Sequence, residues 1–259
     1  MIVEGKTLIV TGAGTGLGRE IAQVALRDGA NVVLAARTQA VLEKSAQELD
    51  PSGKRVAIQA TDITDPGQCE ALAKATVDRF GSIDAIAQVA AMDAVFGGVM
   101  DAKPDDWRKT IETNVIGSTN VVQAVVPQMR KQGGGSIVLI GSQSSNLPLV
   151  PQIAYASSKG ALHTAMFFMA KELGPDKIRV NTVVPTWMWG PPLEWYVKDQ
   201  AEKRNMDVDA VKKEITDGMC LDEIPADEDV AESVIFLSSD RSRMITGQYL
   251  LVNAGELMT

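Results

Sequence analysis

Short runs of consecutive apolar residues alternate along the chain with segments whose apolar residues recur every three or four positions. Residues 7–10 form an apolar, β-branched run that predicts a buried strand. Residues 19–29 place their apolar side chains on one helical face and end on a glycine stop signal. Residues 30–36 predict a second strand, so the chain opens with a strand, a turn, a helix and a strand.

The same alternation continues to the end of the chain, without a linker, an internal repeat or a low-complexity tract. It predicts an α/β fold, with a single doubly wound, Rossmann-type domain over residues 1–259, a mostly parallel central sheet and helices on both faces. The remaining strands are expected at residues 55–60, 83–91, 136–140, 178–184 and 248–252, and the remaining helices at residues 68–80, 107–129, 155–173 and 227–237.

A glycine-rich turn joins the first strand to the first helix: Thr11 is followed by Gly12, Gly16 and Gly18. Glycines lack the Cβ atoms that would block phosphate oxygens, and the free N–H groups of a helix N-terminus bind anions. The spacing differs from G-x-G-x-x-G, but it also provides a turn without Cβ atoms that leads into a helix N-terminus. Because the turn opens a strand–helix–strand unit, it predicts a site for the pyrophosphate of a dinucleotide.

Tyr155 and Lys159 stand four residues apart in a predicted helix, which places both side chains on one face. A phenol with a pKa near ~10 is a poor acid or base at neutral pH, and a nearby ammonium lowers that pKa. Ser142 follows the preceding predicted strand, from which its hydroxyl can reach the same substrate oxygen as Tyr155. A Tyr-x-x-x-Lys pair on a surface helix is common by itself, and its meaning depends on the rest of the chain.

Composition and charge exclude several classes of protein. The apolar fraction of 45% supports a large core, and the net charge of -8 argues against a general nucleic-acid surface or attachment to an anionic membrane. Cys69 and Cys220 have no C-x-x-C spacing, so neither a disulfide framework nor a zinc site is expected, and a reducing cytoplasm fits. No apolar run is long enough to cross a bilayer, and no signal-peptide pattern is present. We expect a cytoplasmic protein with no metal site, no nucleic-acid partner and no membrane partner.

Taken together, the motifs resemble the short-chain dehydrogenase/reductase family over essentially the whole chain. The family's catalytic asparagine, serine, tyrosine and lysine fall on Asn114, Ser142, Tyr155 and Lys159. The resemblance implies an NAD(P)-dependent oxidoreductase that interconverts a carbonyl and a secondary alcohol, with Tyr155 as the acid or base. It further implies that Lys159 lowers the pKa of Tyr155 and holds the nicotinamide ribose, and that Ser142 orients the substrate oxygen. Asn114 would interrupt its helix and anchor a water in a proton relay to Lys159.

The resemblance also implies where the cofactor lies. Ala36 ends the second predicted strand where an acid would select NAD(H), and Arg37 follows it, which suits the 2′-phosphate of NADP(H). NADP(H) is therefore favoured, with NAD(H) as the alternative. The implied cofactor-binding residues are Gly12, Thr15, Gly16, Leu17, Gly18, Arg37, Asp62, Ile63, Ala90, Tyr155, Lys159, Pro185 and Thr186.

Two stretches depart from the family pattern. Residues 88–91 read Gln-Val-Ala-Ala where Asn-Asn-Ala-Gly is usual, so Ala91 adds a methyl group near the expected cofactor. After the sixth strand, Pro185 is followed by Thr186 instead of glycine. Thr186 is the candidate to replace the family's carboxamide-contacting threonine, whose place Gly190 occupies.

The resemblance makes residues 186–225 a lid over the substrate. Trp187, Met188, Trp189 and Trp195 favour a bulky apolar carbonyl or alcohol, such as a 3-oxoacyl, terpenoid or steroid-like compound. Packing of the lid on its own sheet, or a contact between subunits, explains the same residues nearly as well. Family members commonly assemble through the helix that contains residues 167–169, so a homotetramer or homodimer is expected.

Two other classes of function stay open. An epimerase or dehydratase of the extended family would carry a C-terminal substrate domain, for which this chain has no room. A non-catalytic NAD(P)-binding regulatory protein on the same fold is expected to lack one of the four catalytic residues, and all four are present.

Overall fold

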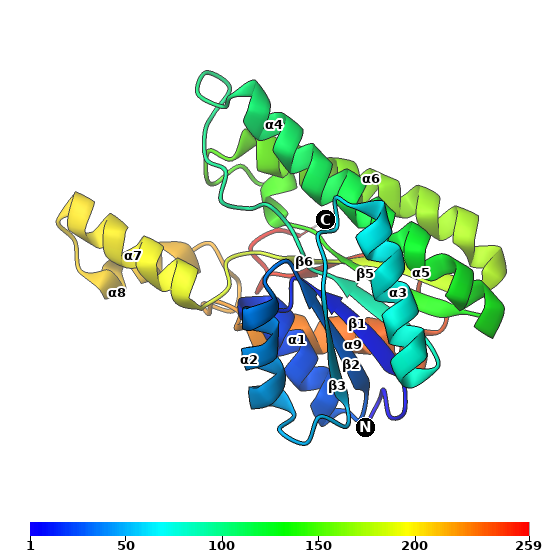
Figure 1. The fold of residues 1–259 in the computed structure, drawn as a ribbon. Coiled ribbons are helices and arrows are strands. Elements are labelled where there is room, and N and C mark those ends of the chain that lie inside the picture. Colours follow the sequence, from blue (N-terminus) through cyan, green and yellow to red (C-terminus); the bar gives the residue numbers. More distant parts are fainter. Residues whose placement is uncertain (259) are drawn as a thin grey trace.

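The computed structural model describes residues 1–258, which build a seven-stranded sheet in which all neighbouring strands are parallel (Figure 1). The strand order is β3-β2-β1-β4-β5-β6-β7, so the direction of winding reverses between β1 and β4. This confirms the predicted doubly wound fold, whose ligands bind at the carboxyl ends of the strands near that reversal. The strands are β1 (Thr7–Thr11), β2 (Asn31–Ala36), β3 (Val56–Ala60), β4 (Ala85–Gln88), β5 (Gly135–Ile140), β6 (Ile178–Pro185) and β7 (Tyr249–Val252).

Helices cover both faces of the sheet and bury one apolar cluster on each (Figure 1). On one face lie α1 (Gly16–Arg27), α2 (Gln39–Leu49) and α9 (Asp227–Ser238). On the other lie α3 (Pro66–Phe80), α5 (Ser118–Gln132) and α6 (Ile153–Leu173). Three short 3₁₀ turns complete this body: η2 (Gln143–Ser145), η3 (Gly174–Asp176) and η4 (Asp240–Ser242).

The helix expected at residues 107–129 is longer and contains a π-helical segment. Helix α4 (Pro104–Ile111) runs into η1 (Glu112–Gly117), a π-helix, and then into α5 without a break. Gly117 allows this segment to pack closely, because a Cβ atom there would lie 2.8 Å from Ile63 Cγ1. The local interruption expected at Asn114 is therefore a widened helical turn.

One strand is shorter than predicted, and one helix was missed. The strand expected at residues 83–91 is only Ala85–Gln88, because the Thr11 hydroxyl accepts the N–H groups of Val89 (3.1 Å) and Ala90 (3.2 Å) and directs the chain out of the sheet. Helix α2 was not predicted. It buries only Leu42 and Ser45, so its apolar periodicity is weak.

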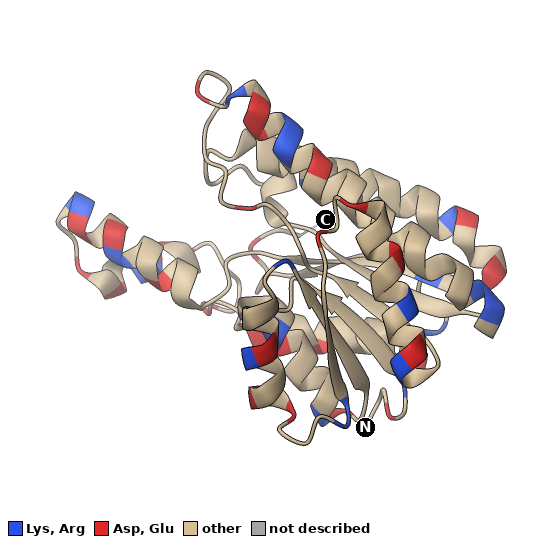
Figure 2. Ribbon diagram, in the orientation of Figure 1, with Lys and Arg blue, Asp and Glu red and all other residues tan. Residues whose placement is uncertain are grey.

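The predicted lid contains two helices, α7 (Pro191–Arg204) and α8 (Val208–Thr216), which extend away from the sheet (Figure 1). Charged residues lie along both helices (Figure 2). Their apolar faces enclose a third buried cluster, formed by Leu193, Val197, Ala201, Val211, Met219 and Ile224. A hydrogen bond from the Trp189 N–H to the Pro225 carbonyl (2.9 Å) joins the two ends of the lid.

Within residues 1–258, none of the helices is both long enough and apolar enough to cross a membrane.

Candidate active site

Strand β5 and helix α6 bring three predicted catalytic residues together. Ser142 follows β5 and caps η2, where its hydroxyl lies 2.9 Å from the Ser144 hydroxyl. Tyr155 and Lys159 share one face of α6, and the Lys159 Nζ lies 5.7 Å from the centre of the Tyr155 ring. Lys159 is buried and donates a hydrogen bond to the Ile140 carbonyl at the end of β5 (2.7 Å). The tyrosine, lysine and serine therefore meet at the carboxyl edge of the sheet.

The pKa values of this pair differ from the simple expectation that an ammonium lowers the pKa of the phenol. Burial raises the pKa of Tyr155 to about 12, partly offset by a hydrogen bond with the Ser142 hydroxyl, and the charge of Asp93 adds to the rise. Burial lowers the pKa of Lys159 to about 8, against an opposing effect of Asp93. In this structure the hydroxyl of Ser142, rather than the ammonium of Lys159, favours the phenolate.

Asn114 is buried in the π-helical segment, and its side chain holds a loop in place. Its Oδ1 accepts the N–H of Met92 (2.7 Å), and its Nδ2 donates to the carbonyl of Met92 (3.0 Å) and to the Ser158 hydroxyl (2.9 Å). Ser158 precedes Lys159 in α6. Asn114 thus joins the loop after β4 to the helix that carries Tyr155 and Lys159, and a role in a water relay stays a prediction.

The glycine turn has the shape that a pyrophosphate requires. A Cβ atom at Gly12 would lie 2.7 Å from the Ala90 backbone nitrogen, and one at Gly18 would lie 2.3 Å from the Gly12 carbonyl oxygen, so the backbone packs too closely for side chains. At Gly16 the same position faces open space. Thr15 makes no side-chain cap on α1, so the first N–H groups of this helix are free to meet an anion. The turn fits a dinucleotide.

Other predicted cofactor residues line the same edge of the sheet. Leu17 and Ile63 are buried, Arg37 is exposed directly after β2, and Asp62 follows β3. The Asp62 carboxylate accepts the N–H (3.0 Å) and hydroxyl (2.8 Å) of Thr64, which orders the loop before α3. Between the glycine turn and α2 lies an open depression of about 340 Å³, which Thr15, Arg19, Lys44 and Glu48 help to line and which the sequence did not reveal.

The departures from the family pattern are accommodated by hydrogen bonds. Gln88 is buried, where its Oε1 accepts the Thr11 hydroxyl (2.7 Å) and its Nε2 donates to the Ala90 carbonyl (3.2 Å). Pro185 ends β6, and the hydroxyl of Thr186 donates to the carboxylate of Glu256. Glu256 stands near the C-terminal end of the chain, and no sequence signal connects it with the strand ends.

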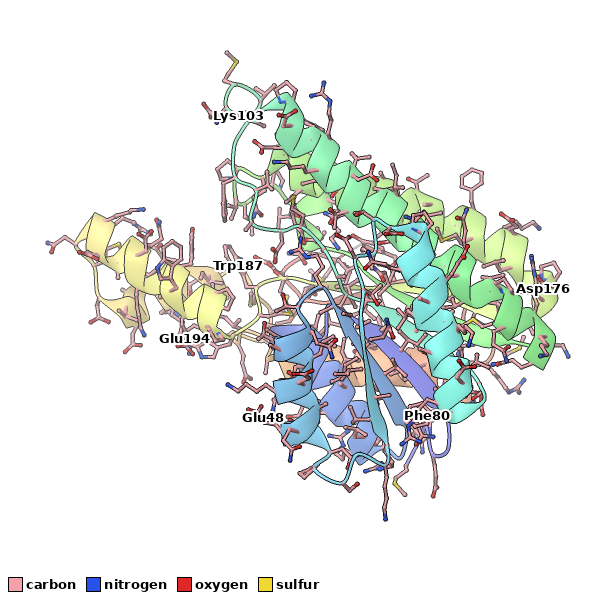
Figure 3. The ribbon with its side chains drawn as sticks, viewed as in Figure 1. Glu48, Phe80, Lys103, Asp176, Trp187 and Glu194 are labelled. Carbon is pink, nitrogen blue, oxygen red and sulfur yellow. The ribbon has the colours of Figure 1, made fainter. Side chains whose placement is uncertain are left out.

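The lid residues differ in their placement. Trp187 lies where the lid meets the body (Figure 3) and stacks on Tyr196 with ring centres 5.4 Å apart. Trp189 packs against the lid's own cluster, with Lys212 Nζ 4.2 Å from the centre of its ring. Met188 packs against the core beside α1 and α9, whereas the side chain of Trp195 is 65% exposed. The aromatic surface expected for substrate is therefore partly used in packing the lid.

No group of three or more histidine, cysteine, aspartate or glutamate side chains within residues 1–258 is arranged to hold a metal ion.

Comparisons with known proteins agree with this geometry. A family model described as short chain dehydrogenase matches residues 6–200. The chain is 33% identical over 257 residues to L-rhamnose 1-dehydrogenase (NAD(P)(+)) of Sphingomonas sp. (strain SKA58), covering 98% of this chain and 97% of that protein. It is 29% identical to the 7alpha-hydroxysteroid dehydrogenase of Escherichia coli (strain K12), covering 98% and 94%. A crystal structure of NAD+-bound xylitol dehydrogenase superposes with a TM-score of 0.90 at 27% identity, covering 98% and 100%.

Proposed function

The chain belongs to the short-chain dehydrogenase/reductase family, and from that premise we propose that it interconverts a carbonyl and a secondary alcohol by proton transfer at Tyr155. It is an NAD(P)-dependent oxidoreductase. The observation that carries the proposed mechanism is the meeting of Ser142, Tyr155 and Lys159 at the end of β5, with Lys159 fixed on the Ile140 carbonyl.

The nicotinamide ring, when bound, supplies or accepts the hydride. With a pKa of about 12, Tyr155 holds its proton at neutral pH and can give it to the oxygen of a carbonyl that is being reduced. Ser142 donates a hydrogen bond to the same oxygen and stabilises its developing negative charge. Lys159 is held by the Ile140 carbonyl one helical turn from Tyr155, where its ammonium would hold the ribose of a bound cofactor.

NADP(H) is the preferred cofactor in this proposal, with NAD(H) as the alternative. Ala36 leaves no carboxylate at the end of β2, and the exposed Arg37 guanidinium can pair with a 2′-phosphate. Lys44 and Arg19 line the neighbouring depression, where Glu48 pairs with Arg19 at 3.1 Å and lies 4.0 Å from Lys44. The positive side chains outnumber the acid there, which suits an added phosphate.

The substrate has two candidate classes. The lid sequence favours a bulky apolar compound, and a hydroxysteroid dehydrogenase is among the relatives. A dehydrogenase named for rhamnose and another named for xylitol favour a polyhydroxylated substrate. The adjacent hydroxyls of Ser142 and Ser144 (2.9 Å) support the second class, whereas the cavity that Ser144 helps to line also contains Leu149 and Val150, which support the first.

We also propose that the protein forms a homo-oligomer and resides in the cytoplasm. Phe167 and Phe168 are exposed on α6, at 48% and 73%, and support a homotetramer or homodimer built through that helix. Cys69 and Cys220 form no disulfide, which suits the cytoplasm.

The test is a substrate screen with both cofactors on the wild type, Tyr155→Phe and the matched control Tyr249→Phe. Tyr155→Phe removes the group proposed to transfer a proton to the reacting oxygen, so we expect kcat to fall at least ~10²-fold. Tyr249→Phe loses a hydroxyl that lies 3.2 Å from the Ser145 hydroxyl and should keep its turnover. NADPH fluorescence measures cofactor binding, which both variants should retain.

Retained turnover in Tyr155→Phe would refute the mechanism. Binding of NADPH without turnover of any carbonyl or alcohol would instead favour a non-catalytic regulatory protein. The ratio of kcat/KM with NADP+ and NAD+ decides the cofactor.

A further inference from the structure

Glu256 brings a carboxylate to the edge of the catalytic site from the far end of the chain. Its Oε2 accepts hydrogen bonds from Gln143 Nε2 (2.6 Å) and from the Thr186 hydroxyl. Gln143 directly follows Ser142, and Thr186 directly follows the last residue of β6. The carboxylate therefore lies near the ends of β5 and β6, bonded to the residues that follow Ser142 and Pro185 in the chain.

The segment that carries Glu256 is held by a buried network. Asn253 Nδ2 donates to Gln143 Oε1 (2.6 Å) and to the Leu257 carbonyl (2.9 Å), while Asn253 Oδ1 accepts the Gly255 N–H (3.1 Å). Gln143 is 3% exposed and Asn253 is 6% exposed. Because its supports are buried and hydrogen-bonded, the carboxylate is positioned before a substrate arrives.

The carboxylate has unused capacity to accept hydrogen bonds. An ionised carboxylate can accept about four, and both donors that Glu256 receives from residues 1–258 are on Oε2. The residue is partly exposed, and neither of these two hydrogen bonds uses Oε1. An apolar substrate that covered Glu256 Oε1 would displace water from it and offer no hydrogen bond in return. Such desolvation of a carboxylate is unfavourable.

The segment that contacts Glu256 through Gln143 begins with polar residues. Residues 142–146 read Ser-Gln-Ser-Ser-Asn without an apolar side chain. The hydroxyls of Ser142 and Ser144 lie 2.9 Å apart, and the Ser145 hydroxyl donates to the Ser142 carbonyl (2.8 Å). The lid supplies less apolar surface than its sequence implies, since Trp189 packs in the lid's own cluster.

From this arrangement we propose that the substrate is polyhydroxylated, a polyol or an aldose, and that Glu256 determines this specificity by accepting a hydrogen bond from a substrate hydroxyl. This inference rests on the proposed function. In the oxidation, the reacting C–H carbon gives its hydride to NAD(P)+ and its hydroxyl gives its proton to the Tyr155 phenolate. The products are the ketone of the polyol, or the lactone of the aldose, with NAD(P)H and one proton.

The experiment compares polyols, cyclic aldoses and apolar secondary alcohols as substrates of the full chain, with NAD+ and with NADP+, at mildly alkaline pH. Polyols or aldoses should exceed the apolar alcohols at least ~10-fold in kcat/KM, because hydrogen bonds to a charged group are strong. The substrates that react show whether the polyol or the aldose is the source of the hydroxyls.

A pair of variants and a pair of substrates then isolate the contact. Glu256→Ala should raise KM for the best substrate about 10- to 100-fold, and the isosteric Glu256→Gln should raise it less. Deoxy analogues that each lack one hydroxyl identify the partner. At that hydroxyl the wild type should prefer the parent about 10- to 100-fold, and Glu256→Ala should show no preference. Glu70→Gln, which removes a charge from an exposed residue of α3 outside the site, is the matched control.

The possible failures are distinguishable. Turnover confined to apolar alcohols and abolished by Tyr155→Phe overturns the inference and leaves the proposed function standing. An equal loss on parent and deoxy substrates in Glu256→Ala and Glu256→Gln overturns the role of Glu256. Absence of turnover on every alcohol, with NADPH still bound, overturns both proposals.

Discussion

The buried charge of Lys159 has opposite effects on the proposed activity and on the stability of the fold. It is 4% exposed, and burial lowers its pKa from 10.5 to about 8. At neutral pH the ammonium is therefore charged inside the protein, where its hydration is lost and the Ile140 carbonyl is its hydrogen-bond partner. In the proposed mechanism this charge holds the ribose of the cofactor, but its burial destabilises the folded state.

Replacing this lysine should stabilise the protein while removing its activity. A shift of this size corresponds to about 3 kcal/mol, and loss of the hydrogen bond to Ile140 offsets about 1 kcal/mol. We expect Lys159→Met to raise the free energy of unfolding at about pH 7 by about 2 kcal/mol. Urea unfolding measures this gain.

The sign of the pH dependence follows from the same shift. The unfolded lysine keeps its proton up to about pH 10.5, whereas the folded one loses it near pH 8, so the unfolded state binds more protons between these values. Wild-type stability should therefore rise from pH 8 toward pH 10, and the rise should be smaller in Lys159→Met. Equal slopes for the two proteins would show that the ammonium is not buried.

At the scale of elements, the sequence correctly predicted those features that depend on the pattern of neighbouring residues. The glycine turn, the alternation of strands and helices, and the Tyr155–Lys159 face all depend on residues close together in the chain. The π-helical turn has no such periodic signature, and α2 buries too few apolar residues to show one. Glu256 was missed because its partners, Gln143 and Thr186, stand 113 and 70 residues away.

The π-helical turn allows a test at this scale. Asn114→Ala removes three hydrogen bonds, two of them to Met92, and leaves partly buried backbone groups without partners. We expect a loss of about 2 kcal/mol in unfolding free energy and a lower kcat. Asn120→Ala, which removes one hydrogen bond to the Ile63 carbonyl, should lose about half as much stability.

Hydrogen exchange separates a local effect from a general one. The Met92 amide proton should exchange faster in Asn114→Ala than in Asn120→Ala, because only the first variant frees that N–H. Unchanged exchange at Met92 would contradict the role of Asn114 as the anchor of this loop.

At the scale of the whole molecule, three apolar clusters are buried, and the apolar side chains left exposed include two on α6. The two sheet faces and the lid each enclose their own cluster. On α6, Phe167 and Phe168 remain outside, on the helix that also carries Tyr155 and Lys159. An assembly built on this helix would bury the exposed pair and restrain the helix that holds the catalytic residues.

A charge on this surface should prevent the proposed assembly. Phe168→Glu places a carboxylate where a partner would bury apolar surface, so sedimentation should give a smaller species than the wild type. Leu221→Glu, at a 73% exposed lid position, is the matched control and should sediment as the wild type. Identical masses for all three proteins would contradict assembly through α6.

The π-helical turn also makes the long helix sensitive to its exact residue count. A regular α-helix advances about 100° per residue, so removing one residue from residues 112–117 would convert the wide turn into an ordinary one and rotate α4 by about 100° relative to α5. The packing of α4 against α6 would then meet different side chains. The extra residue of the π-helical turn thus determines how α4 is rotated relative to α5. A deletion within this turn should lower stability and activity more than any substitution at the same position.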